Sequence, residues 1–400
     1  MAARALRERS KVMVAMTATP VTTKPQDLYI MGQLLGIEGF FDHEEFLQLN
    51  REVNRATRRD NKALRDAGVE GSILRGVLVG KQNTDTPELE FSNVMRQWMS
   101  KMRERFAPNV IRRTIDSLDY TGSKIFGIKP YLEHVLKVKM HNWEMGILRD
   151  FAKEIAKDNP MASPDTRKHF YIEFRRAILH PRLNPKFGDY WKKPESLEAW
   201  QASPEKTIKL DTLAQVVAYH LQKDGQQPLK MDEDGHTLLL NNDCRSDTQS
   251  YPDCDRIVIY SAFPSSNQAI LDILDLYGIR AVELNGSMTS KKRQEAIDAF
   301  RSSTRETGCR VLILSNVGVV GLNLACANIM VILDTTWSAL DDEQLRGRIF
   351  RYPQQKQVHI YRLIALGTPD VFLNNISFDK GQMHFAFVGC DPEIRESICL

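Results

Sequence analysis

The chain has 400 residues, 42% of them hydrophobic and 26% charged, with a formal net charge of +3. This is the balance of an ordinary globular protein, and the length predicts two to three domains of roughly 100–200 residues each. The weakly basic charge allows nucleic acid as a partner without indicating one, and no apolar run approaches the ~18–20 residues that span a bilayer.

The cysteines are scattered along the chain and include no C-x-x-C pair, which disfavours a disulfide framework and a structural zinc site. Cys244 and Cys254 lie near His236 in the sequence, but we expect no metal ion there. Reduced thiols are the simpler interpretation, and they indicate a nuclear or cytosolic protein.

Most of residues 1–200 is expected to be helical. The stretch "KVMVAMTATP" (11–20) predicts one strand that runs into a turn. The stretch "REVNRATRRDNKALR" (51–65) predicts a helix with a stripe of basic residues. This stripe could follow a phosphate backbone through charge alone, although a solvated helix face is the simpler interpretation. Its basic residues recur at helical spacing: Arg51, Arg55, Arg58, Lys62 and Arg65.

The chain changes character near residue 205. Segment 223–253 is polar and turn-rich, which predicts a loop insertion rather than a separate domain. Between residues 255 and 365, short apolar runs alternate with helix-like segments, and such runs are typical of strands buried on both faces of a parallel sheet. The predicted strands are "RIVIYS" (256–261), "AVEL" (281–284), "RVLILS" (310–315), "IMVILD" (329–334) and "VHIYRLI" (358–364).

Two of the segments between these strands carry helix signals. In "SSNQAILDILDLYG" (265–278), serines stand at the expected N-cap, apolar residues recur on one face, and a glycine ends the segment. In "TSKKRQEAIDAF" (289–300), Thr289 is the expected cap, and Ile297 and Phe300 are the apolar anchors.

Strands that alternate with helices in this way predict an open α/β sheet. Ligands of such sheets bind beyond the carboxyl ends of the strands, so Ser261, Ser315 and Asp334 are expected on the functional edge. The stretch "SNVGVVGLNL" (315–324) follows one strand directly, and its glycines and polar residues could present backbone N–H groups to a phosphate. Alone, this glycine-rich loop is a weak signal.

The stretch "EQLRGRIFRYPQQ" (343–355) carries three arginines within six residues. Gln344, Arg348 and Arg351 follow the spacing i, i+4, i+7 and would share one face of a helix. Gly347 lacks a side chain, so another backbone or a ligand could approach it closely. Arginine stays charged and fits phosphate oxygens, so two of them could stabilise a transferring phosphoryl group. The alternative is a solvated basic face.

These stretches resemble, in order, the motifs of the Swi/Snf-type family of superfamily II helicase-like, DNA-dependent ATPases. "QLRGRIFR" (344–351) is similar to motif VI, "SNVGVVGLNL" to motif V and "RIVIYSAF" (256–263) to motif IV. Upstream, "MTATPVTTKPQDLYIMGQLLGI" (16–37) resembles motif III and the helix after it. Three further markers extend the similarity from about residue 10 to residue 375: "IRRT" (111–114), "RRAILHPRLNP" (175–185) and "GIRAVELNGSMTSKKRQEAIDAF" (278–300).

The resemblance implies an α/β fold, a RecA-like parallel sheet flanked by helices, at residues 205–375. A largely helical tail of the first lobe would precede it at residues 1–204, and an extension would follow at residues 376–400. The implied activity is hydrolysis of ATP with magnesium, coupled to movement along double-stranded DNA in chromatin remodelling or repair. The implied location is the nucleus, with no membrane partner.

Roles are implied residue by residue. Arg348 and Arg351 would be catalytic and would contact the phosphates of the nucleotide, with Gln344 and Gly347 completing the nucleotide-binding set. The residues that would couple the nucleotide to the nucleic acid are Ser261, Ser315, Gly318, Gly321 and Asn323. Those that would link hydrolysis to movement of the lobes are Thr17 and Thr19. His180 matches a family marker, but we expect it to pack between the lobes rather than act as a base.

The sequence also departs from the family. Ala18 replaces the usual glycine of motif III, and Phe350 stands where histidine is frequent. A G-x-x-x-x-G-K-[ST] loop and an acidic pair for magnesium are missing: "GVLVGKQ" (76–82) has the wrong glycine spacing, and "MDEDGH" (231–236) lies in a polar turn. We therefore expect the C-terminal portion of such a motor, whose own enzymatic activity stays open. The alternatives are a non-hydrolysing nucleic-acid-binding paralogue and an incomplete gene product.

Overall fold

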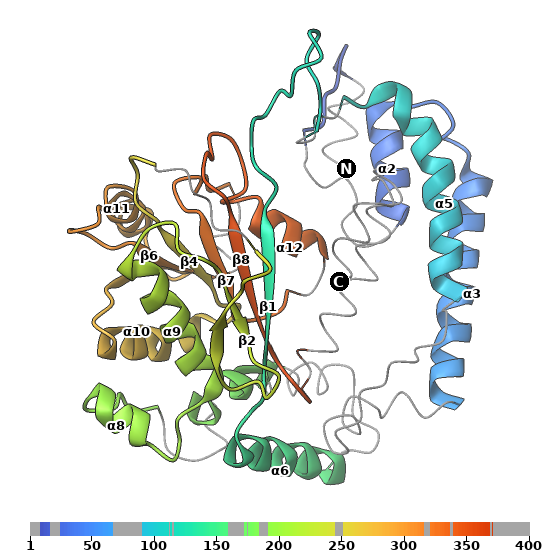
Figure 1. The fold of residues 1–400 in the computed structure, drawn as a ribbon. Coiled ribbons are helices and arrows are strands. Elements are labelled where there is room, and N and C mark those ends of the chain that lie inside the picture. The colour runs from blue at the N-terminus through green and yellow to red at the C-terminus, as the bar shows by residue number, and fades with distance from the viewer. Residues whose placement is uncertain are drawn as a thin grey trace.

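Figure 1 shows a sheet with helices on its faces and, beside it, a separate group of helices. No helix in the described part of the chain is both long and apolar enough to cross a bilayer. The computed structural model describes residues 9–16, 25–66, 90–111, 113, 116–158, 172–173, 175–183, 191–244, 251–315, 321–336, 339–368 and 370.

The elements follow in chain order. The strands are β1 (Leu132–Val138), β2 (Leu229–Met231), β3 (Leu238–Leu240), β4 (Ile257–Tyr260), β5 (Ala281–Leu284), β6 (Val311–Leu314), β7 (Ile329–Ile332) and β8 (His359–Ala365). The α-helices are α2 (Pro25–Leu35), α3 (His43–Asp66), α5 (Glu90–Phe106), α6 (Asn142–Asp158), α8 (Leu197–Ala202), α9 (Ile208–Gln222), α10 (Asn267–Leu276), α11 (Ser290–Arg301) and α12 (Ala339–Arg346). Short 3-10 turns lie at Ala107–Asn109, Pro181–Leu183 and Pro264–Ser266.

The main sheet has six parallel strands in the order β1-β8-β7-β4-β6-β5. All five strands predicted from the apolar runs are confirmed within it, as β4 to β8. Every residue of β4, β6, β7 and β8 is buried. A strand buried on both faces needs mostly apolar side chains, which is why a nearly continuous apolar run marks its position.

The two faces of the sheet are covered by different helices. Because successive side chains of a strand point to opposite faces, Ile257 and Ile259 of β4 join one apolar core, together with α9 and α10. Val258 and Tyr260 join a second core with α11 and α12. The result is a three-layer α/β/α arrangement (Figure 1). The carboxyl ends of the parallel strands, and the loops that follow them, gather at one edge.

Helix ends agree with the sequence in part. The Thr289 cap of α11 is confirmed, because its hydroxyl accepts a hydrogen bond from the Lys292 N–H at 3.4 Å. Ser266 stands at the N-cap position of α10, but its side chain makes no capping hydrogen bond. Its backbone is already helical, at φ −90° and ψ −12°, whereas a capping residue is extended. The serine cap predicted for α10 is therefore wrong.

Strand β1 has no counterpart among the predicted strands. It pairs with β8 in parallel register, from Leu132 opposite His359 to Val138 opposite Ala365. As an edge strand it alternates between buried and exposed residues in its second half, so "LEHVLKV" lacks the apolar run of the inner strands. The sheet thus takes one strand from upstream of the boundary expected at residue 205. That boundary itself stays a prediction.

Helices α2, α3 and α5 pack around an apolar core of their own, which includes Tyr29 and Met95. Glu45 of α3 is clamped by two cations of α5: its carboxylate accepts a hydrogen bond from Arg105 at 2.9 Å and pairs with Lys101. The Arg105 guanidinium, helped by Lys101, lowers the pKa of Glu45 to about 2. These helices are consistent with the helical character expected for residues 1–200.

The strand expected in "KVMVAMTATP" is wrong for its described part, residues 11–16. Val12, Val14 and Met16 are 77%, 76% and 92% exposed. A strand is held by hydrogen bonds to a neighbouring strand, and none of the described strands pairs with this segment. A short apolar run without such a neighbour is not enough. Residues 17–20 lie outside the described residues.

Segment 223–253 is not an irregular loop in its described part, because β2 and β3 form an antiparallel hairpin there. The turn of the hairpin, within "MDEDGH", is closed by the Asp232 carboxylate, which accepts a hydrogen bond from the His236 N–H at 2.9 Å. The hairpin is anchored to the sheet through Leu229, whose N–H donates to the Tyr361 hydroxyl at 3.0 Å. The segment predicted as a loop insertion therefore contains an ordered hairpin in its described part.

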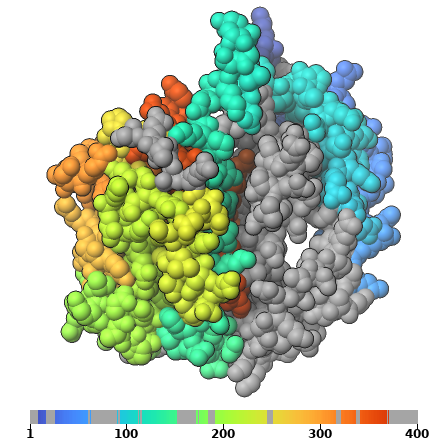
Figure 2. All heavy atoms as spheres, in the orientation of Figure 1, coloured from blue at the N-terminus to red at the C-terminus, as the bar shows by residue number. Residues whose placement is uncertain are grey.

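Residues 116–125 form a small turn, closed by a bridge between Leu118 and Lys124. This turn lies in the teal segment that projects at the top of the space-filling view (Figure 2). At its tip Tyr120 is fully exposed.

His180 packs in an aromatic cluster. Its ring centre lies 4.8 Å from that of Trp191 and 5.9 Å from that of Trp143. Its Nδ1 accepts a hydrogen bond from the Arg182 N–H at 3.1 Å, so Nε2 carries the proton and donates it to the Glu205 carbonyl at 3.2 Å. Burial lowers the pKa of His180 to about 4. A neutral ring with both nitrogens hydrogen-bonded agrees with a packing role.

A second histidine cluster lies between β1, β8 and α9. His134 Nε2 is 3.1 Å from His359 Nδ1, and His220 Nε2 is 2.7 Å from the Tyr361 hydroxyl oxygen. Burial, followed by the neighbouring His359, lowers the pKa of both His134 and His220 to about 3. Folding therefore requires these two rings to be neutral.

We expect the protein to lose stability as the pH falls from 6.5, the ordinary pKa of histidine, toward 3. In this window the unfolded chain binds protons at both rings while the folded chain does not, at a cost of about 1.4 kcal/mol per ring and pH unit. Urea unfolding at about pH 7.5 and pH 5 should show a loss roughly 3–4 kcal/mol smaller in His134→Gln/His220→Gln than in the wild type. The exposed His236→Gln is the control, and equal losses in the double variant and the wild type would contradict the prediction.

Candidate functional site

Ser261, Ser315 and Asp334 follow β4, β6 and β7 at the carboxyl edge of the sheet, and all three are buried. The Ser261 hydroxyl donates to the Asp334 carboxylate at 3.2 Å, and the Ala262 N–H donates to the same oxygen at 2.9 Å. The Ser315 hydroxyl donates to the Leu284 carbonyl at 3.2 Å. These residues lie on the expected edge, where they fasten neighbouring strand ends to each other.

Buried charges surround Asp334. Burial raises the pKa of this carboxyl, while Arg175 and then Lys209 oppose the shift. Lys209 lies 2.7 Å from the Asp370 carboxylate, with both side chains almost fully buried. The Arg175 guanidinium lies over the ring of Phe263, 5.1 Å from its centre. The segment that carries Arg175 is therefore packed directly against the loop after β4.

Motif V is described in part. The Ser315 N–H donates to the Leu284 carbonyl, so it is already engaged within the sheet. Gly318 lies outside the described residues. Gly321 has a φ of +80°, in the left-handed region that favours glycine, and it is exposed. Asn323 is exposed as well, and its Oδ1 accepts a hydrogen bond from the backbone N–H two residues further on.

The helix that carries motif VI ends earlier than the spacing predicts. Helix α12 stops at Arg346, and Arg348 and Arg351 lie in the turns that follow. The Gly347 N–H still bonds to the Glu343 carbonyl, and a Cβ added at Gly347 would lie 3.2 Å from that oxygen. The close neighbour of the glycine is thus its own turn rather than another segment. The prediction that the two arginines share one helical face is wrong, because the backbone leaves the helix between them and Gln344.

Arg348 is joined to motif V through both its backbone and its side chain. Its guanidinium donates to the Leu322 carbonyl at 3.2 Å, and its own carbonyl accepts from the Leu324 N–H at 2.9 Å. Its Nε is buried without a hydrogen-bond acceptor among the described residues. Burial, followed by the positive charge of Arg351, lowers the pKa of Arg348, yet arginine stays protonated at any working pH. A half-buried cation with a spare donor beside a second cation fits an anion.

Arg346, the remaining arginine of the stretch, belongs to a buried ion network. Its guanidinium lies 3.1 Å from the Asp342 carboxylate, 3.8 Å from that of Glu133, and 5.1 Å from the centre of the Tyr131 ring. Arg362 of β8 pairs with the same two carboxylates, at 2.9 Å and 2.8 Å. The network fastens α12 to β1 and β8, and so sets where the turns with Arg348 and Arg351 begin.

Gln354 is a residue of this site that sequence reasoning missed. It is 6% exposed, and its Nε2 donates to the carbonyls of Ala325 and Ala327 at 3.1 Å and 2.7 Å. Its Oε1 accepts from the Lys356 N–H at 3.0 Å. These bonds tie the turns after α12 to the loop that leads into β7. The only sequence signal is the position of Gln354, three residues after Arg351.

The comparisons with known proteins agree with this geometry. Residues 248–353 match the family described as "Helicase conserved C-terminal domain". The chain is 22% identical over 397 residues to the CHD3-type chromatin-remodeling factor CHR7 of Arabidopsis thaliana, covering 97% of this chain and 26% of that protein. It is 29% identical over 340 residues to the ATP-dependent helicase fft1 of Schizosaccharomyces pombe, covering 79% of this chain and 33% of that protein. A solved structure of the C-terminal part of the Fun30 ATPase domain shares 17% identity at a TM-score of 0.44, over 65% of this chain and 97% of that one.

The matched segment contains β4 to β7, α12, Arg348 and Arg351, and these define a RecA-like helicase C-terminal lobe. Residues 248–353 carry a helicase conserved C-terminal domain, and the chain as a whole is similar to the C-terminal region of Swi/Snf-type helicase-like ATPases. It spans about a quarter to a third of the length of the two curated relatives, 26% and 33%.

Proposed function

We propose that this chain supplies the phosphate-sensing second lobe of an ATP-hydrolysing motor that moves along duplex DNA. The proposal rests chiefly on Arg348, whose guanidinium and carbonyl both bond to the motif V backbone and whose Nε has no acceptor in the described part of the chain. Nuclear chromatin remodelling or repair is the proposed setting, because the relatives include a chromatin-remodeling factor and a DNA repair protein.

In this proposal Arg348 and Arg351 contact the phosphates of an ATP that is held by a first lobe. Two guanidinium groups there would stabilise charge on the transferring phosphoryl group. Gln344 and Gly347 complete the nucleotide-binding set. Magnesium is expected to accompany the nucleotide, but no three metal-ligating side chains lie together among the described residues, and no role in binding the ion is assigned to them.

Coupling to DNA would pass from Arg348 to motif V. A movement of Arg348 toward a phosphate would pull on Leu322 and Leu324, between which Asn323 lies exposed. Exposed backbone and amide groups of this kind suit contacts to a nucleic-acid backbone. Buried Ser261 and Ser315 would hold the loop ends in place. Coupling roles for Gly318, Gly321, Thr17 and Thr19 rest on the family resemblance.

The test is ATPase activity of the chain alone and of a two-lobe fusion. The chain alone should show no activity above background, because its 400 residues contain no G-x-x-x-x-G-K-[ST] loop. Fused to an upstream Swi/Snf-type lobe that carries this loop, it should hydrolyse ATP faster when duplex DNA is added. A folded fusion that binds ATP but never hydrolyses it would overturn the proposal.

The second candidate is a nucleic-acid-binding paralogue that hydrolyses nothing. The missing phosphate-binding loop favours it for the 400 residues taken alone. It predicts that the chain binds duplex DNA and that the two-lobe fusion stays inactive. The fusion therefore separates the two candidates.

A further inference from the structure

The basic stripe of α3 is exposed along its whole described length. Arg51, Arg55, Arg58 and Lys62 are all exposed, and they recur at intervals of four, three and four residues. At about 100° per residue, these positions fall within an arc of roughly 60° on the helix. The four cations therefore form one row on a single face of α3.

The row lies opposite the buried side of the helix. Leu49, Val53 and Ala56 of α3 are buried, the first two in the core shared with α2 and α5. This core fixes which way α3 is turned, so the cations cannot rotate inward. Packing, rather than chance, keeps the row on the surface.

The cations of the row have no carboxylate partner within 4 Å among the described residues. The nearby Arg59 differs, because it pairs with Glu90 of α5 at 2.7 Å. Glu52 would interrupt the positive charge, but it is turned away and accepts a hydrogen bond from the Trp98 indole at 2.7 Å. Glu52 is thus engaged elsewhere, and no carboxylate among the described side chains neutralises the row.

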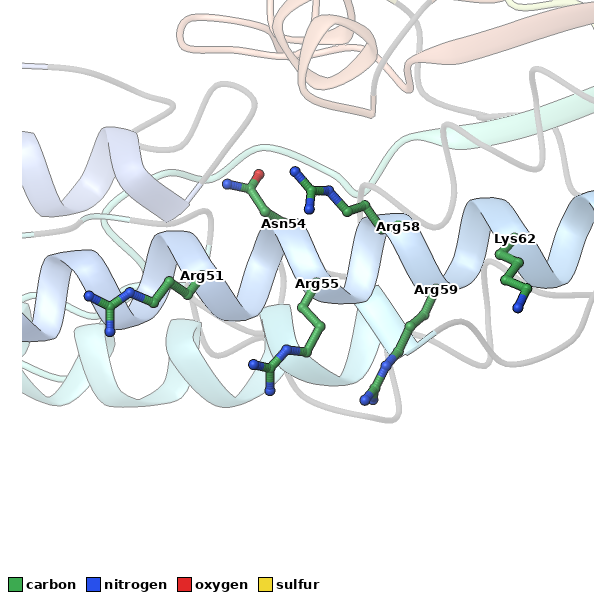
Figure 3. A pocket seen from close by; sticks show the side chains of 6 residues that line it. All are labelled: Arg51, Asn54, Arg55, Arg58, Arg59 and Lys62. Atoms are coloured by element: carbon green, nitrogen blue, oxygen red, sulfur yellow. The ribbon is translucent and has the colours of Figure 1, made fainter.

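A shallow surface depression runs along the row. Figure 3 shows the side chains that line it, with Arg55 and Arg58 on either side of the helix axis. The lining residues all come from α3: Arg51, Asn54, Arg55, Arg58, Arg59 and Lys62. Apart from the cations, the lining contains only the amide of Asn54. The depression therefore offers positive charge but no aromatic ring on which a base could stack.

We propose that this row is a phosphate-backbone contact for duplex DNA, separate from the helicase lobe. From Arg51 to Lys62 there are 11 residue steps, or about 16 Å of helix, which matches roughly five phosphates of one DNA strand. The absence of aromatic side chains in the depression disfavours a single-stranded site, and the absence of large apolar ones disfavours a membrane surface. The inference rests on the proposed function, since that names duplex DNA as the partner.

The experiment measures binding of the full chain to short duplexes of unrelated sequence, by fluorescence anisotropy between about 50 and 200 mM salt. Replacing the row in Arg51→Gln/Arg55→Gln/Arg58→Gln/Lys62→Gln should raise Kd at least about tenfold for every sequence and lower the salt slope by about three to four. The charge-matched control is Arg96→Gln/Arg103→Gln/Arg149→Gln/Lys223→Gln, whose cations are exposed but lie outside the row. It should change the slope by less than about one.

A variant that keeps the charge, Arg51→Lys/Arg55→Lys/Arg58→Lys, is the control for loss of folding. It should retain most of the salt slope. A row variant that behaves like the control overturns the inference alone. A wild-type chain that binds no duplex overturns both the inference and the DNA partner of the proposed function. Tight, row-dependent binding of polyglutamate without binding of DNA would assign the row to an acidic polypeptide and overturn the inference as well.

Discussion

Replacing Arg348 with alanine in the two-lobe fusion is expected to lower kcat by about 10³-fold, the low end of the range for an arginine finger. Arg351→Ala should act in the same direction. KM for ATP should change much less, because the contact is made mainly to the charge of the transition state. Steady-state kinetics with saturating DNA measure both constants.

Three variants make this result specific. Arg348→Lys should recover only part of kcat, because lysine keeps the charge but lacks the planar donors of the guanidinium. Arg280→Ala removes an exposed arginine just before β5, at the end of the strand away from the carboxyl edge, and should change neither constant. If Arg348→Ala had the kcat and KM of the wild type, Arg348 would be only a basic residue of the surface and not part of the nucleotide site.

Asp342→Ala is expected to lower the free energy of unfolding by about 3–5 kcal/mol, because it leaves Arg346 and Arg362 buried with a single shared carboxylate. In the wild-type chain the Asp342 carboxylate lies 3.1 Å from the Arg346 guanidinium and 2.9 Å from that of Arg362. All three side chains are largely buried. Neighbouring positive charge, chiefly that of Arg362, outweighs burial and lowers the pKa of Asp342. Chemical denaturation of the chain measures the loss.

The matched control is Asp275→Ala, which breaks an exposed pair with Lys193 and should leave the unfolding midpoint nearly unchanged. A second variant, Asp342→Ala/Arg362→Met, removes one cation together with the acid and should regain part of the loss. If Asp342→Ala were as stable as the wild type, the network would not hold α12 to the sheet.

Much of the helicase lobe could be predicted from the sequence, since its inner strands are mostly apolar and its loops carry ordered motifs. The edge strand β1 could not, because Lys137 is exposed and only residues such as Leu136 and Val138 face the core. Residues 11–16 show the opposite error. They have the apolar run of a strand, but a strand also needs a neighbouring strand to pair with, and that cannot be seen in the segment itself.

The candidate site, like the fold, could be predicted only in part from the sequence. Sequence spacing placed Arg348 and Arg351 at one site, but it could not separate them from Arg346, which is the same residue type two positions away. Only the contacts with Glu133 and Asp342 assign Arg346 to the interior. Glu133 is distant in sequence and Asp342 belongs to no motif. Only the structure could therefore show that Arg346 is paired in the interior while Arg348 and Arg351 lie in the turns after α12.

The pairing of β1 with β8 has a consequence for how the chain folds. His134 and His359 face each other across 225 positions of sequence, so the sheet contains a contact of very long range. Closing so large a loop is slow, and on the ribosome β1 emerges long before its partner. Until β8 is made, the backbone of β1 has no strand to pair with in the sheet. The segment between the two therefore has to form most of the lobe first, and β1 joins as one of the last elements.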